Sequence, residues 1–212
     1  LTQSTYDGVS YNVETIKSLL DGRVEVLHFD EAWLLHAAFH DFYKNMHAIG
    51  KDRAKTKHSM IFSTQSTHKL LAGLSQASQI LVSESETKKL NRPIFNEAYL
   101  MHTSTSPQYS IIASCDVAAA MMEAPGGPAL VEESITEALD FRRAMRKVDE
   151  EWGKDWWFKV WGPDRLNEDS IGNQQDWMLR PNETWHGFGN LAENFNMLDP
   201  IKATIITPGL GV

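Results

Sequence analysis

Cysteine is almost absent from this sequence, with Cys115 the only one among 212 residues. No disulfide can therefore form within the chain, and we expect a reducing, cytoplasmic compartment. Cys115 belongs to the small-residue run Ala113-Ser114-Cys115, so we expect a packed core thiol rather than a nucleophile.

Long apolar runs are also missing. No uninterrupted run approaches the roughly 20 residues that a membrane-spanning helix needs. The first residues lack a basic segment followed by an apolar one, so we expect neither a signal peptide nor a membrane partner. Because the chain starts at Leu1 without an initiator methionine, we expect a fragment of a longer protein.

Basic residues are outnumbered: 20 Lys and Arg stand against 28 Asp and Glu, for a formal net charge of -8. This balance disfavours nucleic acid as a partner, because phosphate backbones attract cations. It is compatible with a cationic substrate. The share of hydrophobic residues, 42%, is typical of a soluble globular domain with a buried core.

Short β-rich runs alternate with helical stretches along the chain. Hydrophobic spacing predicts strands at residues 24–29, 59–62, 78–82 and 201–207. It predicts helices at residues 12–20, 33–46, 109–122 and 131–152, with the proline and glycine run at 125–128 ending the third. This alternation favours an α/β fold with a largely parallel sheet flanked by helices.

Two polar side chains stand where a phosphorylated cofactor could bind. Asp30 ends the first predicted strand, and ligands of open α/β sheets bind beyond the carboxyl ends of strands. Lys69 follows Ser66, Thr67 and His68 at a strand-to-helix junction, where hydroxyls and free backbone N–H groups can bind phosphate. A shielded lysine there can become a carbonyl nucleophile. The set fits pyridoxal phosphate (PLP), although each feature alone also fits an ordinary helix cap or a solvated side chain.

Several longer strings make the chain similar to a known family, the bacterial ornithine/lysine/arginine decarboxylases, which are fold-type-I PLP enzymes. The strings around the expected cofactor site are His28-Phe29-Asp30-Glu31-Ala32-Trp33 and Thr64-Gln65-Ser66-Thr67-His68-Lys69-Leu70-Leu71. Further matches, in family order, are Ser75-Gln76-Ala77-Ser78, His102-Thr103-Ser104-Thr105-Ser106-Pro107, Trp185-His186-Gly187-Phe188 and Met197-Leu198-Asp199-Pro200-Ile201-Lys202. The resemblance covers essentially the whole chain.

The resemblance implies a fold and a place within a longer protein. Residues 1–198 would be the second, C-terminal half of an aspartate-aminotransferase-like PLP-binding large domain, with a mostly parallel sheet. Residues 199–212 would begin an incomplete C-terminal subdomain. Family members also have a wing domain, a first half of the PLP domain and further phosphate ligands, so we expect this chain alone to bind PLP poorly or not at all.

The resemblance also implies roles for the residues nearest the cofactor. Lys69 would carry PLP as a Schiff base, and Asp30 would pair with the pyridine nitrogen. Ser66 and His68 would bind the phosphate. Ala32 would pack near the ring.

Two further roles concern the rim of the site. Trp33 would lie close to the phenolic oxygen of the cofactor. Ser104, where the family more often has threonine, would reach the phosphate in the neighbouring subunit. The resemblance therefore implies at least a homodimer, and the resembling family forms decamers.

The implied reaction is decarboxylation of a basic amino acid to an amine and CO2, which consumes a proton and serves polyamine synthesis or acid resistance. The stretches 152–163 and 194–199 resemble the lysine and arginine branch more than the ornithine branch, and we favour lysine. A distal carboxylate must meet the substrate's cation. Glu183, beside Trp185 and His186, is the candidate.

Three other interpretations stay open. His36 and His40, spaced i and i+4 on a predicted helix, could bind zinc in a hydrolase, although the sequence identifies no third ligand and we predict no metal site. An inactive homologue could serve as a regulatory or scaffold subunit, but the retention of Lys69, Asp30 and His68 together argues against it. Another PLP reaction, such as transamination, is the third.

Overall fold

The computed structural model describes residues 1–50, 53–166 and 170–207. It divides into two compact units, one made of Leu1–Gln3 and Val13–Gly127 and the other of Ser4–Asn12 and Pro128–Val212. Leu198 and Asp199 share the second unit, so the units do not part at the expected 198/199 boundary. That boundary stays a prediction for the complete protein, and residues 208–212 of the expected subdomain lie outside the described residues.

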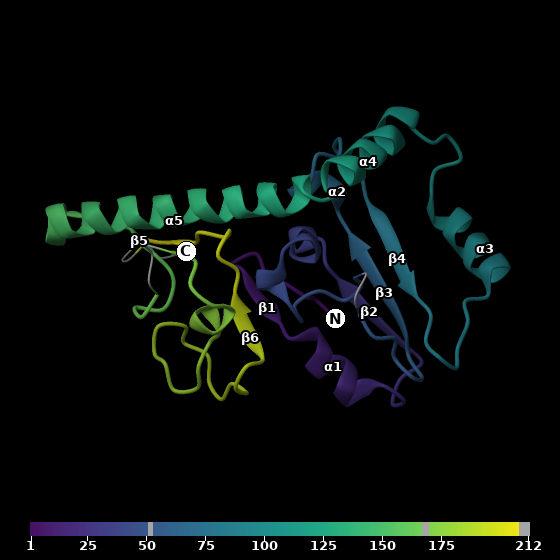
Figure 1. Ribbon diagram of the computed structural model, residues 1–212, viewed down its shortest axis with the longest axis horizontal. Helices are drawn as coiled ribbons and strands as arrows, with labels where there is room; N and C mark the ends of the chain where they lie inside the picture. The colour runs from purple at the N-terminus through teal and green to yellow at the C-terminus, as the bar shows by residue number, and fades with distance from the viewer. Residues whose placement is uncertain (51–52, 167–169, 208–212) are drawn as a thin grey trace. The chain divides into compact units, whose positions relative to one another are not determined.

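The first unit is built on a three-stranded sheet in the order β2 (Val26–Asp30), β3 (Met60–Gln65), β4 (Gln79–Ser83) (Figure 1). Strand β2 runs parallel to β3, with Asp30 opposite Thr64. Strand β4 runs antiparallel to β3, with Ile80 opposite Thr64. The three strands predicted in this part of the chain are confirmed, and β3 extends to Gln65, into the polar segment that precedes Lys69.

Strand alternation divides core from surface in this sheet. In β2 the side chains of Leu27 and Phe29 are buried, whereas those of Val26, His28 and Asp30 are exposed. The buried set packs with helix α1 (Val13–Leu20), and the cluster consists of Val13, Leu27, Phe29, Ala48 and Ile61, with Ile16, Leu20 and Ile49 against it. Because successive side chains of a strand point to opposite faces, Asp30 lies on the face away from this core.

The expectation of a mostly parallel sheet is wrong for the described strands, since β2–β3 is the parallel pair and β3–β4, β1–β6 and β5–β7 are antiparallel. The β3–β4 connection explains the difference. Its helix α2 (Thr67–Leu70) has four residues. It rises about 6 Å, whereas β3 spans about 20 Å. The connection, residues 66–78, has no helix long enough to run back along β3 as a parallel crossover usually does, and β4 runs antiparallel.

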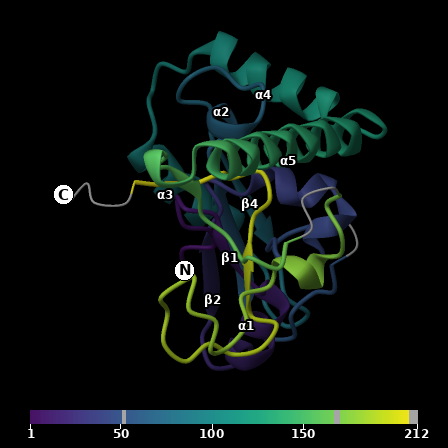
Figure 2. The ribbon, with the colours of Figure 1, turned by 90° about the vertical axis from the view of Figure 1, so that its left-hand side faces the viewer.

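Three helices of the first unit lie at the two ends of the sheet. Figures 1 and 2 show α2 and α4 (Tyr109–Met121) at the end where β2 and β3 finish, and α1 at the opposite end. Helix α3 (Arg92–His102) begins after Asn91, whose side chain accepts from the Ile94 N–H. Helices α1 and α4 confirm the helices predicted at 12–20 and 109–122.

The helix predicted at 33–46 is wrong. The segment forms two short 3-10 helices, Leu35–Phe39 and Asp41–Tyr43. His40 between them has extended backbone angles, and its Nδ1 accepts from the Phe42 N–H at 3.2 Å. This local side-chain bond replaces continuation of the helix.

The second unit holds two small antiparallel pairs. Strand β1 (Val9–Tyr11) pairs with β6 (Asn196–Leu198), and β5 (Lys159–Val160) pairs with β7 (Ile205–Ile206). The late strand predicted at 201–207 is thus shorter than expected. Gly153–Asp155 and Gln174–Trp177 form single 3-10 turns.

Helix α5 (Gly126–Trp152) is the long amphipathic helix, and it starts earlier than predicted because Pro128 is accommodated in its first turn. None of the described helices is both long and apolar enough to cross a membrane.

A buried arginine organises the irregular part of the second unit. Arg142 on α5 is 2% exposed, and its guanidinium donates to the carbonyls of Trp161 (3.1 Å) and Lys202 (3.0 Å). The guanidinium also lies 5.5 Å from the ring centroid of Trp177. One side chain therefore ties the helix to two distant loop segments.

Candidate functional site

The carboxyl end of β2 presents Asp30 to solvent. Its Oδ1 accepts from the Ala32 N–H at 3.1 Å, which turns the chain sharply after the strand. His28 and Thr64 share the exposed face, with 3.2 Å between Nε2 and Oγ1. The carboxylate is therefore fixed by its own turn on the polar face of the sheet.

Lys69 reaches the same edge of the sheet from the neighbouring strand. Strand β3 leads through Ser66 into α2, which carries Lys69. The Lys69 Nζ lies 4.8 Å from the ring centroid of Trp33, three residues after Asp30. Since β2 and β3 are adjacent and parallel, Lys69 and Asp30 both belong to segments that leave the sheet at its carboxyl edge.

The start of α2 carries two side-chain hydroxyl groups, those of Ser66 and Thr67. The backbone N–H groups of His68 and Lys69 already donate to the carbonyls of Ala77 and Ser66. Ser66 precedes the helix without making a side-chain capping bond. Within the described residues, the buried Oγ1 of Thr67 has no hydrogen-bond partner. These two hydroxyls could donate to an anion.

His68 is oriented by its own backbone neighbourhood. Its Nδ1 lies 2.8 Å from the Ala77 carbonyl, which can only accept, so Nδ1 carries the proton. The Nε2 atom is then the ring nitrogen available to a ligand.

Sequence analysis missed the role of Glu31, which is 1% exposed. Its Oε1 accepts from the Ala48 N–H at 2.6 Å, and its Oε2 accepts from the Ser63 hydroxyl and from Gln65 Nε2. Burial raises the pKa of Glu31, against the effect of these hydrogen bonds and of Lys17. The sequence did hold a signal for this role. Glu31 follows the buried residues Leu27 and Phe29 at the two-residue spacing of a strand, so its side chain points to the same buried face.

Ser104 belongs to the segment of the first unit that connects α3 to α4. It follows α3, is exposed, and its hydroxyl accepts from the Ser106 N–H at 3.0 Å. Its expected role in a neighbouring subunit stays a prediction.

Glu183, in the second unit, is already engaged. Its carboxylate accepts from Arg165, from Trp185 Nε1 (2.9 Å) and from the Arg180 N–H (3.2 Å). Burial acts to raise the pKa of Glu183, but these donors and the charge of Arg165 lower it overall. A substrate cation would have to compete with Arg165 for this carboxylate.

The structural premise of the zinc alternative is wrong. His36 and His40 do not share a helical face, because the segment is a 3-10 helix with three residues per turn that ends before His40. His36 is buried, with its ring centroid 4.9 Å from that of Tyr43. No group of three or more His, Cys, Asp or Glu among residues 1–50, 53–166 and 170–207 is arranged to hold a metal ion.

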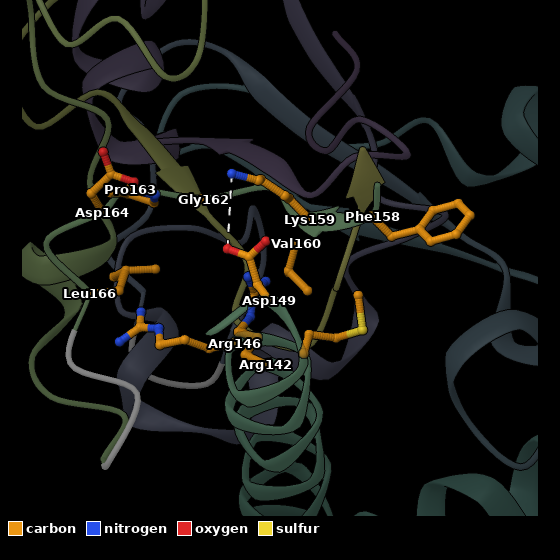
Figure 3. Close-up of a pocket in the computed structure, with 11 residues that line it drawn as sticks. Arg142, Arg146, Asp149, Phe158, Lys159, Val160, Gly162, Pro163, Asp164 and Leu166 are labelled. Atoms are coloured by element: carbon orange, nitrogen blue, oxygen red, sulfur yellow. Dashed lines mark ion pairs between the residues drawn. The ribbon is translucent and has the colours of Figure 1, made fainter. Parts of the chain in front are cut away.

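A small cavity of about 190 Å³ lies in the second unit, between α5 and residues 158–166. Figure 3 shows Arg142, Arg146 and Asp149 of the helix facing this segment. Asp149 and Lys159 form an ion pair at 3.9 Å across it. None of the site residues predicted from sequence lines this cavity.

Comparison with known proteins adds independent support to these observations. The family model described as "Orn/Lys/Arg decarboxylase, major domain" matches residues 1–212. The chain is 53% identical to lysine decarboxylase LdcA of Pseudomonas aeruginosa, over 99% of this chain and 28% of that protein. It is 41% identical to the biodegradative arginine decarboxylase of Escherichia coli, over 100% of this chain and 30% of that protein.

A solved structure gives the same result in three dimensions. The Francisella novicida lysine decarboxylase LdcF superposes with a TM-score of 0.86 at 45% identity, over 100% of this chain and 28% of that one. The chain thus spans a little over a quarter of the relatives that it matches. Its family model, its relatives and its α/β fold agree, and the chain belongs to the Orn/Lys/Arg decarboxylase family, whose major domain its sequence matches.

Proposed function

We propose that the complete protein is a PLP-dependent decarboxylase of a basic amino acid. The observation that carries this proposal is the meeting of two chain segments at one sheet edge: Lys69 packs its amine on Trp33, in the turn that Asp30 begins. Family membership supplies the reaction class.

The residues at this edge fit PLP. Lys69 would hold the aldehyde carbon, and Asp30, with one oxygen used by Ala32, would hold the ring nitrogen with the other. The buried, unpartnered hydroxyl of Thr67 and the uncommitted hydroxyl of Ser66 offer donors to the phosphate. His68, whose Nδ1 proton is held by the Ala77 carbonyl, would add a donor at Nε2 when its ring is in the cationic form.

When bound, PLP accepts the electron pair that the departing carboxylate leaves on the substrate. Asp30 keeps a proton at the ring nitrogen, because its carboxylate stabilises the cationic form. Lys69 would supply the amine that holds the cofactor when no substrate is bound. Trp33 lies against the Lys69 amine and would restrict where it can move.

The remaining structural predictions belong to the complete protein. We place this chain in the second half of a fold-type-I large domain, and Ser104 in the site of a neighbouring subunit of a homodimer or larger homo-oligomer. Helix α4 is unusually apolar, yet Ala118 is its buried residue. This fits a helix that other parts of the complete protein would cover.

Lysine is the proposed substrate. Identity is higher to the lysine decarboxylase of P. aeruginosa than to the arginine decarboxylase of E. coli. The test is release of CO2 and the identity of the amine, measured with the complete protein on lysine, arginine and ornithine. The largest kcat/KM is expected for lysine, and a larger value for arginine would reassign the substrate.

The same assay separates the enzyme from an inactive homologue. Absence of CO2 release from all three amino acids, in a protein that is folded and supplied with PLP, would favour a regulatory or scaffold role. Release of a keto acid instead of CO2 would favour transamination.

A further inference from the structure

A buried hydrogen-bond network joins the two strands that carry the proposed site. Asp30 and Glu31 are consecutive and point to opposite faces of the sheet. Glu31 crosses to β3, where its Oε2 accepts from Ser63 and from Gln65 Nε2 at 3.1 Å. Gln65 is followed by Ser66 and by the helix that carries Lys69. Glu31 thus connects the segment bearing Asp30 to the segment bearing Lys69.

The network has little freedom to rearrange. Gln65 is fixed in its amide orientation, because its Oε1 accepts from Gln79 Nε2 of β4 at 2.7 Å. The other oxygen of Glu31 accepts from the Ala48 N–H. Any slip of β2 against β3 at this end would leave buried polar groups unpaired, which is costly.

One charged side chain faces this network from α1. Lys17 acts on Glu31 through its charge, but its Nζ is bound to the Ala48 carbonyl at 2.8 Å and to Glu14 at 3.1 Å. The direct donors to Glu31 are therefore neutral groups.

We propose that Glu31 is a positioning residue that sets the spacing between Asp30 and Lys69. The proposal rests on the proposed function of the site. It predicts that disturbing Glu31 weakens PLP binding and turnover through geometry, without touching the substrate or the cofactor.

Glu31→Gln in the complete enzyme is the central variant. The new amide has a single acceptor oxygen, so it cannot accept from both the Ala48 N–H and the Gln65 amide, and one of these buried donors loses its partner. Glu25→Gln is the matched control, because it makes the same chemical change just before β2, at an exposed side chain. The double variant Glu31→Gln/Gln65→Glu exchanges donor and acceptor and restores the pair.

The measurements are PLP affinity of the apoenzyme by absorbance titration, kcat and KM, and apoprotein folding by circular dichroism. We expect Glu31→Gln to weaken PLP binding and to lower kcat by about tenfold each, the size of a lost hydrogen bond to a charged group. KM for the amino acid should stay within about twofold. Glu25→Gln should match the wild type, and the double variant should recover most of both losses.

A folded Glu31→Gln enzyme that matches Glu25→Gln in PLP affinity and kcat would overturn the proposal, as would a double variant no better than the single one. Should Glu31→Gln not fold, Ser63→Ala removes one donor and carries the test. A PLP affinity about threefold weaker supports the proposal, and an unchanged one overturns it. Failure of the proposed function has a different signature, since the wild-type enzyme would then neither bind PLP nor release CO2.

Discussion

The two units of this chain reach order by different means. In the first, β2 and β3 alternate buried and exposed side chains, and this parity alone puts Asp30 outside and Glu31 inside. In the second, the strands have two or three residues, and the buried guanidinium of Arg142 holds loop carbonyls in place. In a regular strand, each residue can be assigned to one face from its position. In an irregular segment, the position of the backbone depends on single side-chain contacts. Substitutions on the exposed face of the first unit should therefore change turnover without changing the stability of the fold. Substitutions at the anchoring contacts of the second unit should lower its stability.

Lys69→Ala should have the largest effect. If Lys69 holds the cofactor as proposed, loss of its amine is expected to reduce decarboxylation in the complete enzyme by more than about 1,000-fold. Because Lys69 is only half-buried, secondary structure by circular dichroism should stay unchanged. Turnover above a tenth of the wild-type value would remove Lys69 from the proposed role.

Asp30→Ala should come next, with kcat lower by about 100- to 1,000-fold. Without its carboxylate the ring nitrogen would lose its proton and the cofactor would accept electrons poorly. Asp30→Glu offers a graded comparison, since it keeps the charge but moves it. Stopped-flow kinetics of CO2 release would measure both, and near-normal turnover in the alanine variant would contradict the assignment.

Arg142→Met tests the second unit. It leaves two loop carbonyls without their donors and should cost about 3 kcal/mol of local stability. Hydrogen exchange at residues 157–163 and 198–204 in the complete protein would report this loss. Arg143→Met, which removes a partly exposed ion pair with Asp140, should change exchange by less than about 0.5 kcal/mol. Equal effects for the two variants would contradict the anchoring role of Arg142.

Substitution of Asp21 should have the smallest effect, and the stabilisation that Asp21 provides should depend on pH. Its carboxylate accepts from the backbone N–H groups of Lys57, His58 and Ser59. Burial acts to raise its pKa, but these bonds lower it overall to about 2 from 3.8. The stabilisation is therefore present above about pH 4 and is lost as the pH falls toward about 2.

Asp21→Asn should remove about 1 kcal/mol of protection at neutral pH and abolish this pH dependence. Hydrogen exchange at residues 57–59 provides the measurement. A wild-type protein whose protection there does not change between pH 5 and pH 2, after correction for intrinsic exchange rates, would show that the three bonds do not stabilise the folded state.

The regular elements of the first unit could be predicted because hydrophobic spacing reflects the face that each side chain occupies. This succeeded for β2, β3, β4, α1 and α4. It failed at residues 33–46, where apolar spacing resembled a helix but the His40 side chain bonds to the backbone and splits the segment. It also failed for strand direction, since β4 runs antiparallel after a connection that holds only one turn of helix.

The family could be identified from local strings of residues. The same strings name Lys69, Asp30, Ser66 and His68 as the expected cofactor residues, because they match the family in order. Three features emerge only in the folded chain: Lys69 packs on Trp33, Glu31 bridges to Ser63 and Gln65, and Arg142 is buried. Contacts between residues far apart in the chain depend on register and burial, which local spacing does not specify.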